Sequence, residues 1–154
     1  MYVRSLLAAS ALALGLFVAA TPAPAGDGSA TYQDIEKTLG LVPGFFKVMS
    51  DTAVPGAWEE MKGLQMNPGT ALPGRTKELI GLAVAAQIPC EYCIIYHTEA
   101  ARGAGATDQQ IQEAVGMAAV TRESSTLFNG LQIDKTQFRK DLDRLMQGPH
   151  QAKK

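Results

Sequence analysis

Two cysteines and a histidine lie close together in the segment 89–97 (PCEYCIIYH), where Cys90, Cys93 and His97 follow a C-x2-C-x3-H pattern. On a helix, residues three and four positions apart are neighbours, so the three side chains would share one narrow stripe about two turns long. Cysteines at this spacing can form a reversible disulfide. The imidazole, four residues after Cys93, can accept its thiol proton or stabilise its thiolate. Cys90 has a different source of thiolate stabilisation: it lies at the expected helix start, where the helix dipole favours an anion.

Glu78 is the fourth candidate for chemistry, because it falls in a strongly apolar stretch shortly before the cysteines. A carboxylate close to an apolar surface costs free energy unless it is paired or hydrogen-bonded. The imidazole of His97 is a natural partner, and together the groups would form a carboxylate–imidazole–thiol relay. The alternative is an exposed glutamate in the first turn of a helix, beside Arg75 and Lys77.

Two further interpretations of these residues remain open. The cysteines could form a structural disulfide or be two small buried thiols, although a disulfide across such a short loop constrains the unfolded chain little. Cys90, Cys93, His97 and Glu78 could instead supply the four ligands of a zinc ion. An oxidising compartment and the crowding of three ligands on one helix disfavour zinc, so we expect no metal and no cofactor.

The elements that must position these groups are predicted to be helices, because no convincing run of alternating strand-like residues occurs. Thr31 with Asp34 predicts one helix start and Thr107 with Asp108 another, while Gly40 predicts a helix end. Phe45, Phe46, Val48 and, further along, Trp58, Met61 and Phe128 are expected in the core or in subunit contacts. The expected helices are 31–39, 43–50, 55–66, 75–88, 89–103, 109–127 and 134–146. The chain is therefore predicted to be one all-α domain of six or seven helices.

Length and composition support a single exported domain. The chain has 154 residues with 14 basic and 15 acidic side chains, which gives no sign of nucleic-acid binding. It opens with Arg4, an apolar run over 6–20 and the small residues Ala23-Pro24-Ala25. This layout is typical of a secretory signal peptide, and the apolar run is too short to span a bilayer. We expect 1–25 to be a signal peptide and 26–154 to be the folded domain, with no membrane attachment after cleavage. Export to a bacterial periplasm would let the cysteines be oxidised.

The chain resembles the AhpD-like alkylhydroperoxidase branch of the carboxymuconolactone decarboxylase family. The resemblance rests on Glu78-x11-Cys90-x2-Cys93-x3-His97, set in TKELIGLAVAAQIPCEYCIIYHTEAARGAGATDQQIQEAV. It implies an all-helical fold, assembly into trimers or hexamers, and reduction of hydroperoxides by the cysteine pair with Glu78 and His97 as proton relay. Tyr92 stands where some members have a second histidine between the cysteines. The decarboxylase branch does not depend on a cysteine pair, so its reaction is not implied.

The expected function is therefore an exported thiol peroxidase that acts on a hydroperoxide and is reduced by an external dithiol. Cys93 is expected to attack because His97 is one turn away, and Cys90 to resolve, although the helix-start argument favours the opposite roles. The alternatives are a thiol–disulfide oxidoreductase that ignores peroxide, and a non-enzymatic helical oligomer with a structural disulfide.

Overall fold

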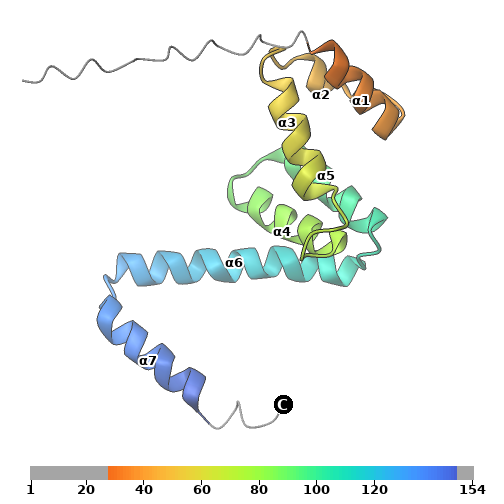
Figure 1. The fold of residues 1–154 in the computed structure, drawn as a ribbon. Coiled ribbons are helices and arrows are strands. Elements are labelled where there is room, and N and C mark those ends of the chain that lie inside the picture. Colours follow the sequence, from red (N-terminus) through yellow and green to blue (C-terminus); the bar gives the residue numbers. More distant parts are fainter. Residues whose placement is uncertain (1–27, 149–154) are drawn as a thin grey trace, which may run out of the picture. The chain divides into compact units, whose positions relative to one another are not determined.

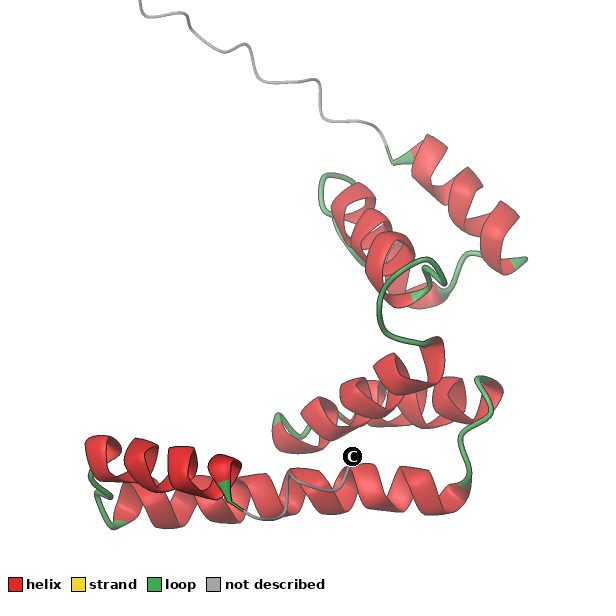
Figure 2. Cartoon of the chain, turned by 60° about the horizontal axis from the view of Figure 1, so that its bottom comes forward, coloured by secondary structure: helices red, strands yellow, loops and turns green. Residues whose placement is uncertain are grey.

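The computed structural model describes residues 28–148, and all regular structure within that range is helical (Figures 1 and 2). The α-helices are α1 (Ser29–Leu39), α2 (Gly44–Lys47), α3 (Val54–Glu60), α4 (Gly74–Gln87), α5 (Glu91–Gly103), α6 (Asp108–Gly130) and α7 (Lys135–Gln147); a π-helical segment, η1 (Met61–Gln65), follows α3. The predicted all-α fold is confirmed. The expected signal peptide over 1–25 lies outside the described residues.

The first of two compact units ends at Pro55 and contains α1 and α2. α1 begins at Ser29, two residues before the predicted start, because Gly28 adopts a left-handed conformation (φ 70°) and so begins the helix without a side-chain cap. Its end at Gly40, also left-handed, is confirmed. Ile35 is buried, and the Tyr32 hydroxyl donates a hydrogen bond to the Phe46 carbonyl at 3.3 Å.

The prediction for the segment 43–50 was partly wrong. The helix is only four residues long, and Phe45 and Val48 are 48% and 86% exposed. A helix of about one turn can direct only a narrow face inward, and Phe46 occupies that face with 1% exposure. The Phe45 ring packs against the Phe46 ring, with centroids 4.6 Å apart.

The second unit, residues 56–154, is organised around α4, which packs against both α5 and α6. One core cluster joins these three helices through the buried side chains of Leu82, Ala101 and Ile111. Around them lie the partly buried Leu79, Ile94 and Ala106. A helix that is apolar nearly all round is expected to be covered on several sides. α4 is covered by α5 and α6, but its Ile80 and Val84 side chains remain 48% and 53% exposed.

Polar contacts fix the ends of these helices. Gln87 at the end of α4 donates its side-chain amide to the Ala118 carbonyl of α6 at 2.6 Å, while Arg122 donates to the Gln87 carbonyl at 3.1 Å. The start of α6 is a capping box in which Thr107 and Gln110 satisfy each other's backbone N–H groups, as Thr107 predicted. The axial position of α4 against α6 is therefore set by hydrogen bonds as well as by apolar packing.

The predicted helix over 55–66 is interrupted. The α-helical pattern ends at Glu60 and continues as the π-helical η1, which is closed by an i→i+5 hydrogen bond from Met66 N–H to the Met61 carbonyl at 2.9 Å. Lys77 of α4 holds the end of this segment, because its Nζ donates to the carbonyls of Leu64 and Asn67 at 2.7 Å each. A turn of this kind leaves no periodicity signal that sequence patterns would detect.

α6 and α7 are the last two helices of the second unit (Figure 1). α6 continues to Gly130, three residues beyond its predicted end, and α7 contains no buried residue. The Phe128 ring, predicted as a core or contact residue, is 46% exposed and packs against Phe138 of α7 at 5.6 Å between centroids. Among the described residues, the helices are all too short or too polar to cross a bilayer.

Candidate functional site

Glu78 and His97 meet between α4 and α5. Glu78 lies in the second turn of α4 and is 7% exposed, so the alternative of an exposed first-turn glutamate is wrong. Its Oε2 lies 2.7 Å from Nδ1 of His97, whose side chain is 20% exposed. The apolar packing of α4 against α5 thus brings together two of the four residues singled out from the sequence.

The hydrogen bond determines how the imidazole can act. A carboxylate only accepts hydrogen bonds, so Nδ1 carries the proton and Nε2 is left as the acceptor in the neutral ring. If Nε2 takes a proton, the carboxylate stabilises the resulting imidazolium. The pair is therefore arranged as a base oriented by a carboxylate.

Gly81, one turn after Glu78 on α4, makes room for the imidazole. A Cβ at this position would lie 2.5 Å from Nδ1 and 2.7 Å from Nε2 of His97, closer than real Cβ atoms come to other atoms. The imidazole therefore lies directly against the backbone of α4. A glycine inside a helix lowers helix stability by about 1 kcal/mol relative to alanine, and this close approach is its structural reason.

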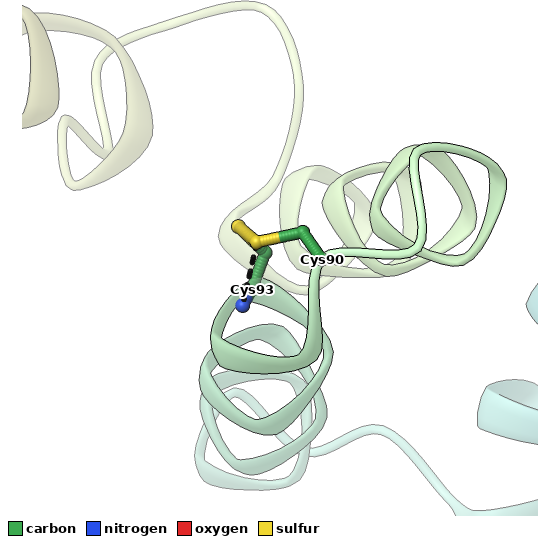
Figure 3. The surroundings of a disulfide bond; sticks show 2 residues. All are labelled: Cys90 and Cys93. Atoms are coloured by element: carbon green, nitrogen blue, oxygen red, sulfur yellow. Dashed lines mark hydrogen bonds between the residues drawn. A yellow bond between two sulfur atoms is a disulfide. The ribbon is translucent and has the colours of Figure 1, made fainter.

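Cys90 and Cys93 form a disulfide at the start of α5 (Figure 3). Cys90 was predicted to lie on the same helical stripe as Cys93 and His97. In the structure it is instead the N-cap residue just before α5, with an extended backbone (φ −91°, ψ 97°). Its Sγ accepts the backbone N–H of Cys93 at 3.2 Å, the dashed line in Figure 3. One of the free N–H groups of the helix start thus donates to the Cys90 sulfur, as expected from its position.

Gln65 of η1 also contacts the carboxylate, and the sequence patterns gave no reason to select it. Its side-chain Nε2 lies 3.2 Å from Oε1 and 3.4 Å from Oε2 of Glu78. Glu78 is thus contacted from η1 on one side and from α5 on the other. Gly81 could have been selected from the sequence, because a glycine within an apolar helical stretch indicates a close approach; Gln65 carried no such signal.

Tyr96 is a second residue that the sequence patterns missed. Its ring meets the His97 ring edge-on, with centroids 5.3 Å apart and planes at 87°. Partial burial raises the pKa of the Tyr96 phenol, and the negative charge of Glu78 raises it further. Tyr96 is therefore a neutral neighbour of the Glu78–His97 pair.

A pocket of about 390 Å³ lies near this pair, although Glu78, His97 and the two cysteines are not among its lining residues. Its wall includes Gln65 and Gly81, both of which contact the pair, and the rest is largely apolar, with Leu64, Leu72 and Ile80. The pocket has the size and chemistry to hold a small organic group.

The four candidate residues are not gathered as metal ligands. Among residues 28–148, no group of three or more histidine, cysteine or acidic side chains is placed to hold a metal ion. The two sulfurs are bonded to each other, and Glu78 is engaged with His97 and Gln65.

Comparison with known proteins defines the class to which this fold and site belong. The model of the carboxymuconolactone decarboxylase family matches residues 52–135, more than half of the chain, and the chain belongs to this family. Its fold is similar to the crystal structure of the alkylhydroperoxidase AhpD core from Rhodospirillum rubrum, with 28% identity and a TM-score of 0.63 over 70% of this chain and 82% of that one. The AhpD-like assignment suggested by the cysteine, histidine and glutamate spacing is confirmed.

A curated relative is similar over a shorter stretch. The chain is 50% identical over 52 residues to uncharacterized protein 4 in the cox locus of Paracoccus denitrificans. The match covers 34% of this chain and 47% of that protein, so the chain spans about half the length of this relative.

Proposed function

We propose that the protein is an exported thiol peroxidase that reduces hydroperoxides through Cys90 and Cys93. The observation that carries the proposal is the hydrogen bond between Glu78 and His97. His97 lies on α5, the helix that begins at the Cys90–Cys93 disulfide. An oriented base one turn from a redox cysteine is what activation of a thiol requires. Similarity to an alkylhydroperoxidase structure supports the same activity.

The reaction starts from the reduced protein. The thiol proton of Cys93 passes to Nε2 of His97, and Glu78 stabilises the imidazolium. The thiolate then attacks the terminal oxygen of the hydroperoxide, an S–O bond forms and the O–O bond breaks. The leaving alkoxide, or hydroxide from hydrogen peroxide, takes the proton from His97 and departs as alcohol or water. Cys93 is left as a sulfenic acid.

The Cys90 thiol completes the cycle. Its sulfur attacks the sulfenic sulfur, the Cys90–Cys93 bond forms, and the sulfenic oxygen leaves as water with the Cys90 proton. Two electrons and two protons from an external dithiol then restore both thiols by thiol–disulfide exchange. The pocket near the Glu78–His97 pair has room for the organic part of a hydroperoxide.

A single-turnover experiment tests the activity. Reduced protein freed of excess reductant is mixed with hydrogen peroxide or with tert-butyl hydroperoxide, and peroxide loss and free thiols are counted. We expect one peroxide to be consumed and two thiols lost per chain. Cys93→Ser should abolish consumption, and His97→Ala should slow it. Cys90→Ser should still consume one peroxide and accumulate a sulfenic acid that dimedone traps.

The same samples separate the proposal from its alternatives. A protein that reduces insulin disulfides or oxidises thiol substrates while leaving peroxide untouched would be a thiol–disulfide oxidoreductase. A disulfide that resists mild dithiol treatment, with no peroxide loss in any sample, would indicate a structural role.

Assembly and location extend the proposal. We propose that the protein forms homo-oligomers, because many large apolar side chains on α6 and α7 are exposed in the single chain, including Met117, Val120, Leu127 and Leu145. Monomeric proteins rarely expose so much apolar surface on neighbouring elements.

We also propose a periplasmic location, on the basis of the signal-like residues 1–25.

A further inference from the structure

The carboxylate of Glu78 is enclosed by groups from three elements. On α5, His97 bonds Oε2, and Tyr96 places its phenol close enough to feel the carboxylate charge. On η1, the Gln65 amide reaches both carboxylate oxygens. Lys77, the neighbour of Glu78 on α4, is turned to the carbonyls of Leu64 and Asn67. On α6, Arg122 binds Gln87, which lies nine residues after Glu78 on α4.

We propose that Gln65 is a positioning residue of the Glu78–His97 relay, an inference that rests on the proposed function. By donating to both oxygens, the amide holds the carboxylate in the plane and direction from which Oε2 meets His97 Nδ1. The amide carries no charge of its own, so it can orient the carboxylate without adding a charge to the site.

The chemistry of glutamine suits this role better than that of other polar residues. An arginine or lysine would place a cation against the carboxylate and weaken its hold on the imidazolium. A glutamate would add a second negative charge at the same site. The amide donates hydrogen bonds, carries no charge and does not exchange protons with the relay.

The conformation of η1 keeps the amide in place. The π-helical segment ends at Gln65, and its end is fixed by Lys77, the residue directly before Glu78. The hydrogen bonds of Lys77 to the carbonyls of Leu64 and Asn67 therefore hold Gln65 close to Glu78. Irregular helical turns of this kind are often found at functional sites.

The test compares Gln65→Met with the wild-type protein and with Gln112→Met, a matched change on the exposed face of α6. Single-turnover peroxide reduction is measured from pH 5 to pH 9. Without the amide, the carboxylate is no longer held toward His97, so the acidic limb of the Gln65→Met rate profile should be displaced from that of the wild type by at least half a pH unit. The Gln112→Met profile should overlay the wild type.

The conservative variant Gln65→Glu provides a second arm. A protonated glutamate donates as the amide does, so this variant should retain more activity than Gln65→Met at acidic pH. It should lose that advantage as the pH rises and the new carboxyl ionises. A uniform loss of rate with an unchanged profile in both variants would mean that Gln65 only stabilises the fold, and the proposal would be wrong.

Nitrogen NMR of the imidazoles gives a readout that does not require peroxidase activity. The chain has two histidines, so His150→Gln leaves the signals of His97 alone. We expect Gln65→Met to shift the His97 Nδ1–H resonance and to speed its exchange with water. If the wild-type protein reduces no peroxide, the proposed function fails but this arm still decides whether Gln65 orients the pair. Unchanged His97 signals would overturn the inference.

Discussion

The Glu78–His97 pair combines a nearly buried carboxylate with a partly accessible imidazole. Glu78 is 7% exposed, and its carboxylate is hydrogen-bonded by His97 at 2.7 Å and by Gln65 at 3.2 Å. A buried carboxylate without such contacts would be strongly destabilising. The pair therefore has a structural role between α4 and α5 as well as the proposed chemical one, and variants must separate the two.

Replacing Glu78 with glutamine should strongly reduce the rate of peroxide reduction while changing the free energy of unfolding little. The amide keeps the size of the side chain but no longer stabilises an imidazolium at His97, so the single-turnover rate should fall by about 10²-fold. Stopped-flow measurement on the reduced protein checks this. Glu113→Gln on the exposed face of α6 is the matched control and should react like the wild type. Equal rates in all three proteins would remove Glu78 from the mechanism.

The phenol of Tyr96 reports on the charge of Glu78. Burial is the larger cause of its raised pKa, and the carboxylate charge is the smaller one, because a nearby anion disfavours tyrosinate. Glu78→Gln should therefore lower the Tyr96 pKa while leaving it above the ordinary tyrosine value. Ultraviolet titration near 295 nm measures the change, with the same titration of Tyr96→Phe subtracted. A pKa that rises or stays fixed would show that the charge of Glu78 does not reach the phenol.

Among the elements, the two site helices α4 and α5 and the helix α6 that packs on α4 were predictable, whereas η1, which also contacts Glu78, was not. The apolar composition of α4 and the capping pattern at Thr107 indicate α4 and α6 directly. The spacing of Cys90, Cys93 and His97 predicted a helix at α5, although Cys90 lies just before it. η1 escaped prediction because its π-helical turn and its contact with Glu78 depend on Lys77, which is 12 residues from Gln65 along the chain. Contacts between separate segments leave no local pattern.

Two glycines in helices should respond in opposite ways to alanine. Gly116 of α6 has open space where a Cβ would lie, so Gly116→Ala should raise the free energy of unfolding by about 0.5–1 kcal/mol. At Gly81 the added methyl would meet the imidazole, and overpacking of this kind costs about 1–3 kcal/mol. Gly81→Ala should thus show no such gain and should lose peroxide activity at least tenfold. Urea unfolding and single-turnover rates measure both effects. Full activity in Gly81→Ala would show that the position of His97 against α4 is not needed.

For the whole molecule, the exposed apolar surface is the feature that a single folded chain leaves unexplained. On α7, four large apolar side chains are 40–72% exposed, although Phe138 also contacts Phe128: Phe138, Leu142, Leu145 and Met146. The sequence showed the amphipathic pattern of this helix but not which surface it would meet. A second copy of the chain is the partner that we propose for this face and for the apolar side chains of α6.

Charged residues on this face should weaken self-association. The double variant Leu142→Lys/Leu145→Lys should have a lower mass than the wild type by light scattering after size-exclusion chromatography. Two lysines buried between copies of the chain would oppose their association. Thr136→Lys adds the same kind of charge on the opposite face of α7 and is the control. A wild-type protein that is already monomeric at micromolar concentration would contradict the proposed assembly.

The hydrogen bond from the Cys93 N–H to the Cys90 sulfur has a consequence for recycling of the oxidised protein. In thiol–disulfide exchange, the sulfur that departs most easily is the one whose anion is best stabilised. The N–H at the start of α5 stabilises negative charge on Cys90, so an incoming thiolate should attack Cys93 and expel Cys90. When the oxidised wild-type protein is treated briefly with a small monothiol and quenched with an alkylating reagent, mass spectrometry should find the added thiol on Cys93 and the alkyl group on Cys90. The reverse distribution would contradict this expectation. The first residue before the helix would thus decide where a reducing partner becomes attached.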